Sequence, residues 1–255
     1  MSAGTREWDA GTYDRVSSPQ QEWSAAVIER LGLRGDETVL DAGCGSGKVT
    51  EALLAKLPRG TLIAVDGSAA MVDLARERLG PRVEVIHADL LDLELDRQVD
   101  VVFSNAVFHW IADHAALFER LAAVLKPGGR LEAQCGGEGN VARFYATAAE
   151  AATDERFRPF LEDFAPVHFA GPGETSRLLA AAGFVDVNCN LEPRPVRPPE
   201  PEAFIRTVCL GSHLDRLPEG LRDDYLAAVL ERMGPEPELD YVRLNISAGR
   251  LAAPG

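Results

Sequence analysis

A short apolar run that leads into alternating glycines is the feature that most constrains the fold of this chain. Residues 38–47 read Thr-Val-Leu-Asp-Ala-Gly-Cys-Gly-Ser-Gly, with glycine at positions 43, 45 and 47. An apolar strand followed by a glycine turn and a helix lets the backbone approach a ligand closely and directs free N–H groups toward it. The segment therefore predicts a nucleotide-type cofactor site. Dinucleotide and nucleoside binders share this order of elements, so the segment alone leaves the cofactor open.

Strands and helices alternate with short connections along the first half of the chain. Apolar residues recur at helical spacing in the expected helices, and short apolar or alternating runs mark the expected strands. The expected helices are 21–33, 48–57, 68–79 and 113–125, and the expected strands are 39–40, 62–65, 83–86, 99–103 and 130–134, with Lys126-Pro-Gly-Gly129 as the turn before the last strand. Right-handed crossovers then imply an α/β, Rossmann-like fold in which a mostly parallel sheet carries helices on both faces and a ligand at the strands' carboxyl ends.

The chain changes character after Gly139. Residues 140–172 and 200–236 are helical in pattern but do not fit the strand–helix alternation, so we interpret them as two parts of a split helical cap. Tyr241, Arg243 and Asn245 alternate with apolar residues, which predicts a final antiparallel strand that completes a seven-stranded sheet. The expected organisation is 1–34 N-terminal lid and first helix, 35–139 cofactor-binding core, 140–172 cap, 173–199 core continuation with a helix, a strand and a proline-rich connector, 200–236 cap, and 237–255 final strand and tail.

Composition narrows the class of partner. The formal net charge is -14, from 26 Lys and Arg against 40 Asp and Glu, so the surface is expected to repel phosphate backbones and anionic lipid. The four cysteines are far apart and show no metal-binding spacing, which predicts reduced thiols and no metal site. No apolar window approaches the ~20 residues of a membrane helix, and the N-terminus has no apolar signal core. We expect a cytoplasmic protein that binds neither nucleic acid nor membrane.

The spacing of the glycines distinguishes between two cofactors. A dinucleotide fingerprint would place its third glycine at position 48, where this chain has Lys48. The pattern Asp41, Gly43, Gly45, Gly47 instead resembles the first motif of the Rossmann-like, class I S-adenosylmethionine-dependent methyltransferases. The resemblance continues at the later strand ends, in an ordered set that covers roughly residues 36–136. That set consists of Asp66, Ala88-Asp89-Leu90, Ser104-Asn105-Ala106 and Lys126-Pro-Gly-Gly129.

The resemblance implies S-adenosyl-L-methionine as cofactor, with S-adenosyl-L-homocysteine as product. A carboxylate at Asp66 can accept both ribose hydroxyls, and Asp89 can accept the exocyclic amine of adenine. Met71 and Leu90 offer apolar faces to the ring. The simpler alternatives are that Asp66 caps a helix and that Asp89 begins a turn. The full expected cofactor set is Asp41, Gly43, Gly45, Asp66, Met71, Ala88, Asp89, Leu90 and Asn105.

Residues for the methyl acceptor are expected just after the strand 99–103. His109 is the candidate catalytic residue, as a base or as a hydrogen-bond donor, and Trp110 is a candidate substrate wall. Equally, Trp110 can be core and His109 a pocket-lining residue whose polar atoms are satisfied. Tyr13 and Gln20 lie in a segment similar to the lid of small-molecule methyltransferases, which makes them candidate substrate contacts.

Within that family, the chain looks most like the trans-aconitate methyltransferase group. The resemblance is carried by the run from Asn105 to Trp110, by Asp113-His114 and Leu117-Phe118, and by Gln134. It implies O-methylation of a small carboxylic acid. The alternatives are O-, N- or C-methylation of another metabolite, a nicotinamide-dependent oxidoreductase, or a cofactor-binding protein without catalysis.

Overall fold

A seven-stranded sheet forms the centre of the protein. The computed structural model describes residues 18–165 and 167–252. The strands run in the order β3-β2-β1-β4-β5-β7-β6, and β7 is antiparallel to both of its neighbours. The strands are β1 Thr38–Ala42, β2 Thr61–Asp66, β3 Glu84–His87, β4 Val99–Asn105, β5 Leu125–Gly136, β6 Phe184–Pro193 and β7 Val242–Arg250. The Rossmann-like fold expected from the alternation is therefore confirmed.

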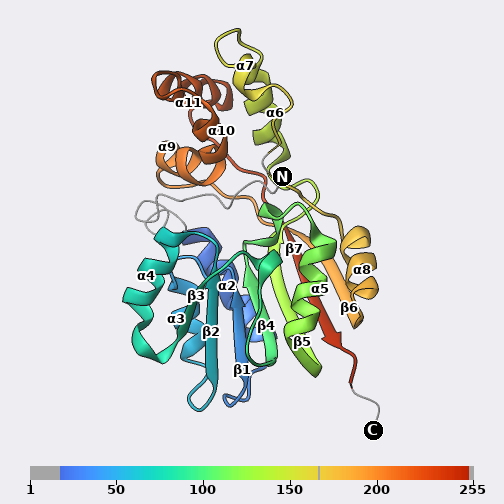
Figure 1. Ribbon diagram of the computed structural model, residues 1–255. Coiled ribbons are helices and arrows are strands. Elements are labelled where there is room, and N and C mark those ends of the chain that lie inside the picture. The colour runs from blue at the N-terminus through green and yellow to red at the C-terminus, as the bar shows by residue number, and fades with distance from the viewer. Residues whose placement is uncertain (1–17, 166, 253–255) are drawn as a thin grey trace.

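Helices cover both faces of the sheet because each presents one apolar side to it. On one face of the sheet, α2, α3 and α4 pack against β1, β2 and β4 and bury Val27, Leu53 and Ala75. On the other face, α5 and α8 bury residues such as Phe118 and Leu179. Their bounds are α2 Ser18–Arg30, α3 Lys48–Leu54, α4 Ala69–Leu79, α5 His114–Val124 and α8 Pro172–Ala181. Figure 1 shows these helices flanking the strands.

Two expected elements differ in detail. β5 begins at Leu125, so the expected turn at residues 126–129 lies inside the strand, where pairing with β4 absorbs it as a shift of register. The first part of the helical segment expected over 200–236 is divided into three pieces, α9 Pro201–Phe204, a π-helical stretch Ile205–Cys209 and α10 Gly211–Arg216. Tertiary packing outweighs the local pattern in both places.

A second group of helices stands above the carboxyl ends of the parallel strands (Figure 1). It contains α6 Ala142–Ala152, α7 Arg158–Leu161, α9, α10 and α11 Glu219–Met233. These helices share a core of their own around Tyr225, whose hydroxyl donates to the backbone oxygen of Ala148. Two sequence-distant segments thus form the split cap.

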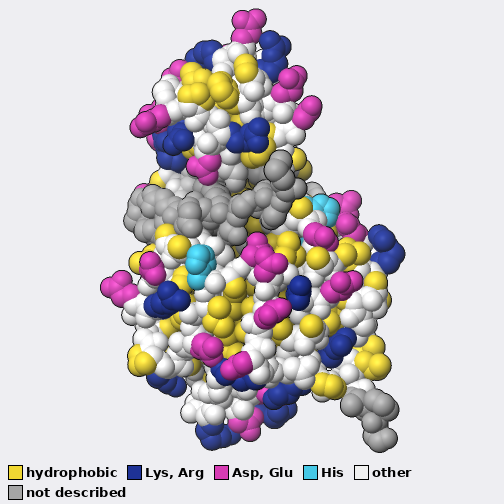
Figure 2. Space-filling model, in the orientation of Figure 1, with side chains coloured by type: hydrophobic (Ala, Val, Ile, Leu, Met, Phe, Trp, Pro, Cys, Tyr) yellow, Lys and Arg dark blue, Asp and Glu magenta, His cyan; other side chains and the backbone are white. Residues whose placement is uncertain are grey.

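The charge distribution on the surface and the length and polarity of the helices are relevant to binding of nucleic acid and membranes. On the face in Figure 2, Lys and Arg side chains are interspersed with Asp and Glu and form no continuous basic area. Among the described helices, none combines the length and the apolar character that a membrane crossing requires.

Candidate cofactor and acceptor site

The glycines of the loop after β1 differ in the space that surrounds them. Gly43 and Gly47 have φ angles of 87° and 79°, and a Cβ at Gly43 would lie 2.2 Å from the side chain of Val107. Gly45 has a φ of 55°, but a Cβ there would meet no atom of the described residues within 4 Å. Gly43 therefore allows the segment after β4 to pack closely, whereas the described residues leave open space in front of Gly45.

Alanine substitutions should separate these two cases. Gly43→Ala combines a left-handed backbone with a steric overlap, so it should lower the free energy of unfolding by about 3 kcal/mol. Gly45→Ala should cost only about 1 kcal/mol, from the backbone alone. Its Cβ would occupy the open space, so its main effect should be weaker binding of S-adenosylhomocysteine. Urea denaturation and titration calorimetry measure both, and equal destabilisation by the two variants would contradict this division.

Asp41 lies beneath the glycine loop rather than on its surface. Its side chain is 1% exposed and accepts a 2.7 Å hydrogen bond from the Thr50 hydroxyl. Burial raises the pKa of Asp41 to about 7, against the effect of the Thr50 donor, and the negative charge of Asp66 adds to the rise. Asp41 thus joins the end of β1 to α3.

Asp66 connects the glycine loop to the next β/α turn. One carboxylate oxygen accepts from the Gly45 N–H at 2.8 Å, and the other accepts from the Ser68 N–H at 2.9 Å. The side chain is only partly buried. Ser68 itself caps α4 by accepting from Met71 N–H. Asp66 therefore holds the loop in position while remaining accessible at the sheet edge.

The remaining candidate cofactor residues lie along the same edge. The parallel register brings the ends of β1, β2 and β3 together, and Ala88 N–H donates to the backbone oxygen of Asp66 at 3.1 Å. The Asp89 side chain accepts a hydrogen bond from Leu91 N–H, so Asp89 begins a turn. This is the simpler alternative to a contact with adenine. Met71 and Leu90 are buried. Asn105 is half-buried at the end of β4, which neighbours β1 in the sheet.

His109 is buried just after β4, and its hydrogen bonding defines its protonation. The Gly136 N–H donates to Nδ1 at 3.3 Å, so in the neutral ring the proton resides on Nε2. Burial lowers the pKa of His109 to about 3, with contributions from the positive charge of Arg243 and from His114. The ring stacks against Phe169 with 5.8 Å between centroids. His109 is thus a neutral group that can donate through Nε2.

Arg243 is a candidate functional residue that no sequence motif indicated. It is 2% exposed, donates from Nε to the Gln134 side-chain oxygen at 3.3 Å, and lies over the ring of Trp23 at 4.9 Å. Arg243, His109 and Trp110 line one narrow cavity of about 40 Å³. The alternating pattern of β7 marked Arg243 as part of a polar face, but only the structure places that face inward.

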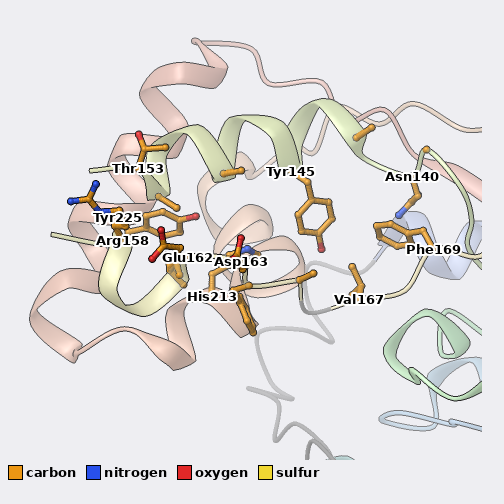
Figure 3. A pocket seen from close by; sticks show the side chains of 17 residues that line it. Asn140, Tyr145, Thr153, Arg158, Glu162, Asp163, Val167, Phe169, His213 and Tyr225 are labelled. Carbon is orange, nitrogen blue, oxygen red and sulfur yellow. The ribbon is translucent and has the colours of Figure 1, made fainter. Parts of the chain in front are cut away.

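A larger cavity of about 630 Å³ lies in the cap and adjoins the narrow one (Figure 3). Figure 3 shows Tyr145 between Phe169 at one end and His213 and Tyr225 toward the other. The two cavities share Asn140, Tyr145, Val167 and Phe169 as lining residues.

The two candidates from the N-terminal segment are not assigned to either cavity. Tyr13 lies outside the described residues, and Gln20 lies in α2 with a side chain that is likewise outside them.

Comparison with known proteins agrees with this architecture. Residues 39–129 match the family model described as a methyltransferase domain. A trans-aconitate 2-methyltransferase from Acidovorax sp. strain JS42 is 31% identical over 89% of this chain and 89% of its own length. The crystal structure of the YcgJ protein from Bacillus subtilis has a TM-score of 0.64 at 18% identity and covers 91% of this chain and 99% of that one.

A further solved structure contains the cofactor. Haemonchus contortus phosphoethanolamine N-methyltransferase 2, in complex with S-adenosyl-L-methionine, has a TM-score of 0.57 at 19% identity, over 91% of this chain and 53% of that one. The sequence motif, the sheet order and the similarity over nearly the whole chain agree. The chain belongs to the class I S-adenosylmethionine-dependent methyltransferases, in the family that includes the trans-aconitate 2-methyltransferases.

Proposed function

We propose that this enzyme methylates a carboxylate oxygen of a small organic acid. The observation that carries the proposal is the pairing of a neutral imidazole donor, His109, with a buried guanidinium, Arg243, around one narrow cavity. A carboxylate accepts hydrogen bonds and carries a negative charge, and these two side chains supply a donor and a positive charge. The proposal also agrees with the name of the Acidovorax relative.

Features of the sheet edge support the cofactor residues proposed from the sequence. The space that the described residues leave in front of Gly45 would admit a ligand to the backbone, and we assign the partly buried Asp66, at the end of β2, to the ribose hydroxyls. We assign Met71 and Leu90 to the adenine ring, and Asp89 to its exocyclic amine. Asp41 and Gly43 would support the loop from below rather than touch the cofactor. When bound, S-adenosylmethionine supplies a methyl group already activated by its sulfonium.

A carboxylate acceptor makes few chemical demands on the protein. Its oxygen forms a bond to the methyl carbon as the carbon–sulfur bond breaks, and the electron pair of that bond stays on sulfur. No proton has to be removed, so orientation and proximity supply the acceleration. His109 and Arg243 would orient the carboxylate, and Trp110 would form a wall beside it. A phenol or amine acceptor would instead need a base, and His109 is poorly suited to that task because its Nδ1 is already an acceptor for Gly136.

Replacement of His109 tests this assignment. His109→Gln keeps an N–H donor, so kcat for a carboxylic acid should fall by no more than about 10-fold, whereas loss of a general base costs ~10²-fold or more. Because the pKa of His109 is about 3, the imidazole stays neutral over the usual assay range. Parent and variant should therefore share the same pH profile between about pH 6 and 9. An inflection that is present in the parent and lost in the variant would contradict the assignment.

A further inference from the structure

The cap cavity is large enough to bind most of a small molecule. Its volume of about 630 Å³ falls within the ~300–1,000 Å³ of ligand pockets. The described part of its lining comes from α6 and the residues on either side of it, from α7 and the segment that follows α7, and from α10 and α11. The narrow cavity at His109 and Arg243, at about 40 Å³, holds little more than a single functional group.

Most of the cap cavity wall is apolar or aromatic. Tyr145, Phe164 and Tyr225 surround His213, with ring centroids at 6.0, 5.2 and 6.2 Å from that of the imidazole. The small side chains of α6 complete one side, as expected for a surface that accommodates flat or chain-like apolar groups. The α6 residues that line the cavity are Ala142, Tyr145, Ala149 and Ala152.

The charged residues of this cavity do not suit a polyanion. Arg158 lines it, but so do Glu162 and Asp163. Burial lowers the pKa of His213 to about 4, so this imidazole adds no positive charge at neutral pH. An acceptor with two or three carboxylates would have to place at least one of them in this cavity, against a net negative lining.

His213 adds a specific polar feature. It is 5% exposed, and its Nδ1 is buried without a hydrogen-bond partner among the described residues. Such a nitrogen is unfavourable in a folded protein unless something else satisfies it. A single neutral hydroxyl or carbonyl group on a bound molecule would suit a neutral imidazole in an aromatic cavity.

The cap cavity adjoins the acceptor site. Tyr145 and Phe169 line both cavities, and Phe169 also stacks on His109. The body of an acceptor whose carboxylate lies between His109 and Arg243 would therefore extend past these rings into the cap.

From this arrangement we propose, building on the carboxylate O-methylation proposed above, that the acceptor is a monocarboxylic acid with an apolar or aromatic body that fills the cap cavity. This substrate class differs from the tricarboxylate in the name of the Acidovorax relative. The body carries at most one neutral polar group, which would lie beside His213.

An acceptor series tests the proposal directly. With labelled S-adenosylmethionine, kcat/KM should rise from acetate through phenylacetate to 4-phenylbutyrate, by ~10²-fold in total, because the phenyl group and methylenes leave water. trans-Aconitate should be a poorer acceptor than 4-phenylbutyrate. A preference for trans-aconitate would overturn the proposal while leaving carboxylate methylation intact. Methylation of phenols or amines but of no carboxylic acid would overturn both.

A matched pair of variants locates the apolar body. Ala146 and Ala149 are both exposed on α6, but only Ala149 is among the residues that line the cavity. Ala149→Phe should lower kcat/KM for 4-phenylbutyrate by ~10-fold or more and leave that for acetate within about twofold, because only the larger acid needs the filled space. Ala146→Phe should change neither. Equal effects of Ala149→Phe on both acids, or no effect on either, would contradict the proposed position.

Discussion

Arg243→Gln is expected to lower kcat/KM for carboxylic acids by ~10²-fold or more, because a buried charge that pairs with a ligand carboxylate contributes about 2–5 kcal/mol. The guanidinium is held in place by Gln134 and Trp23, and it lines the cavity next to His109. The affinity for S-adenosylhomocysteine should stay within about twofold, since Arg243 lies on β7, away from the glycine loop in the strand order. Initial rates and titration calorimetry measure the two quantities.

Two further variants sharpen this prediction. Arg243→Lys retains the charge but not the planar, two-pronged donor, so its kcat/KM should lie between those of the parent and Arg243→Gln. Arg250 lies at the opposite end of β7 and donates to the backbone oxygen of Ala182, so Arg250→Gln should leave kcat/KM unchanged. A fall in cofactor affinity as large as the fall in kcat/KM would show that Arg243 acts by supporting the fold.

Asp66→Asn is expected to weaken S-adenosylhomocysteine binding by ~10²-fold, because two hydrogen bonds from ribose to a charged acceptor become weaker or are lost. Asn keeps one acceptor oxygen, so part of the link from Asp66 to Gly45 or Ser68 should persist. The loss of negative charge should also lower the pKa of Asp41, which the charge of Asp66 helps to raise. Calorimetric titration measures the affinity.

The control for Asp66→Asn is a second acid of the same β/α unit. Asp73 is exposed on α4, where it pairs with Arg76, so Asp73→Asn should leave cofactor affinity unchanged. A change of less than about threefold for Asp66→Asn would mean that Asp66 serves only to join the glycine loop to α4.

The core of the fold was predictable because its signals are local. Apolar runs marked the strands of the parallel part, and glycine, proline and capping residues marked where helices stop and start, as at Ser68 before α4. Since parallel strands end at a common edge, Asp66 and Asp89 could be expected at one site from their positions alone. The sequence predicted that β5 begins after the turn at residues 126–129, but the strand begins before it. Pairing with β4 outweighs the turn signal of Pro127 and the two glycines that follow it.

The acceptor site was less predictable because distant segments form it. Arg243 belongs to an alternating strand, whose polar side usually faces solvent, but here Trp23 and the cap bury it. Sequence spacing marked His109, but its role as donor or base depends on the bond from Gly136, which no local pattern reveals. The cap cavity depends on how α6 and α11 pack, across about 80 residues of chain.

The chemical identity of the methylated product is the most direct test of the account. The enzyme would be incubated with methyl-labelled S-adenosylmethionine and a mixture of carboxylic acids, phenols and amines, and the labelled products would then be treated with mild base. A methyl ester hydrolyses under these conditions and releases labelled methanol, so the account predicts that most of the label becomes volatile. Label that stays attached to a product after base treatment, as an ether or an N-methyl or C-methyl group, would contradict it.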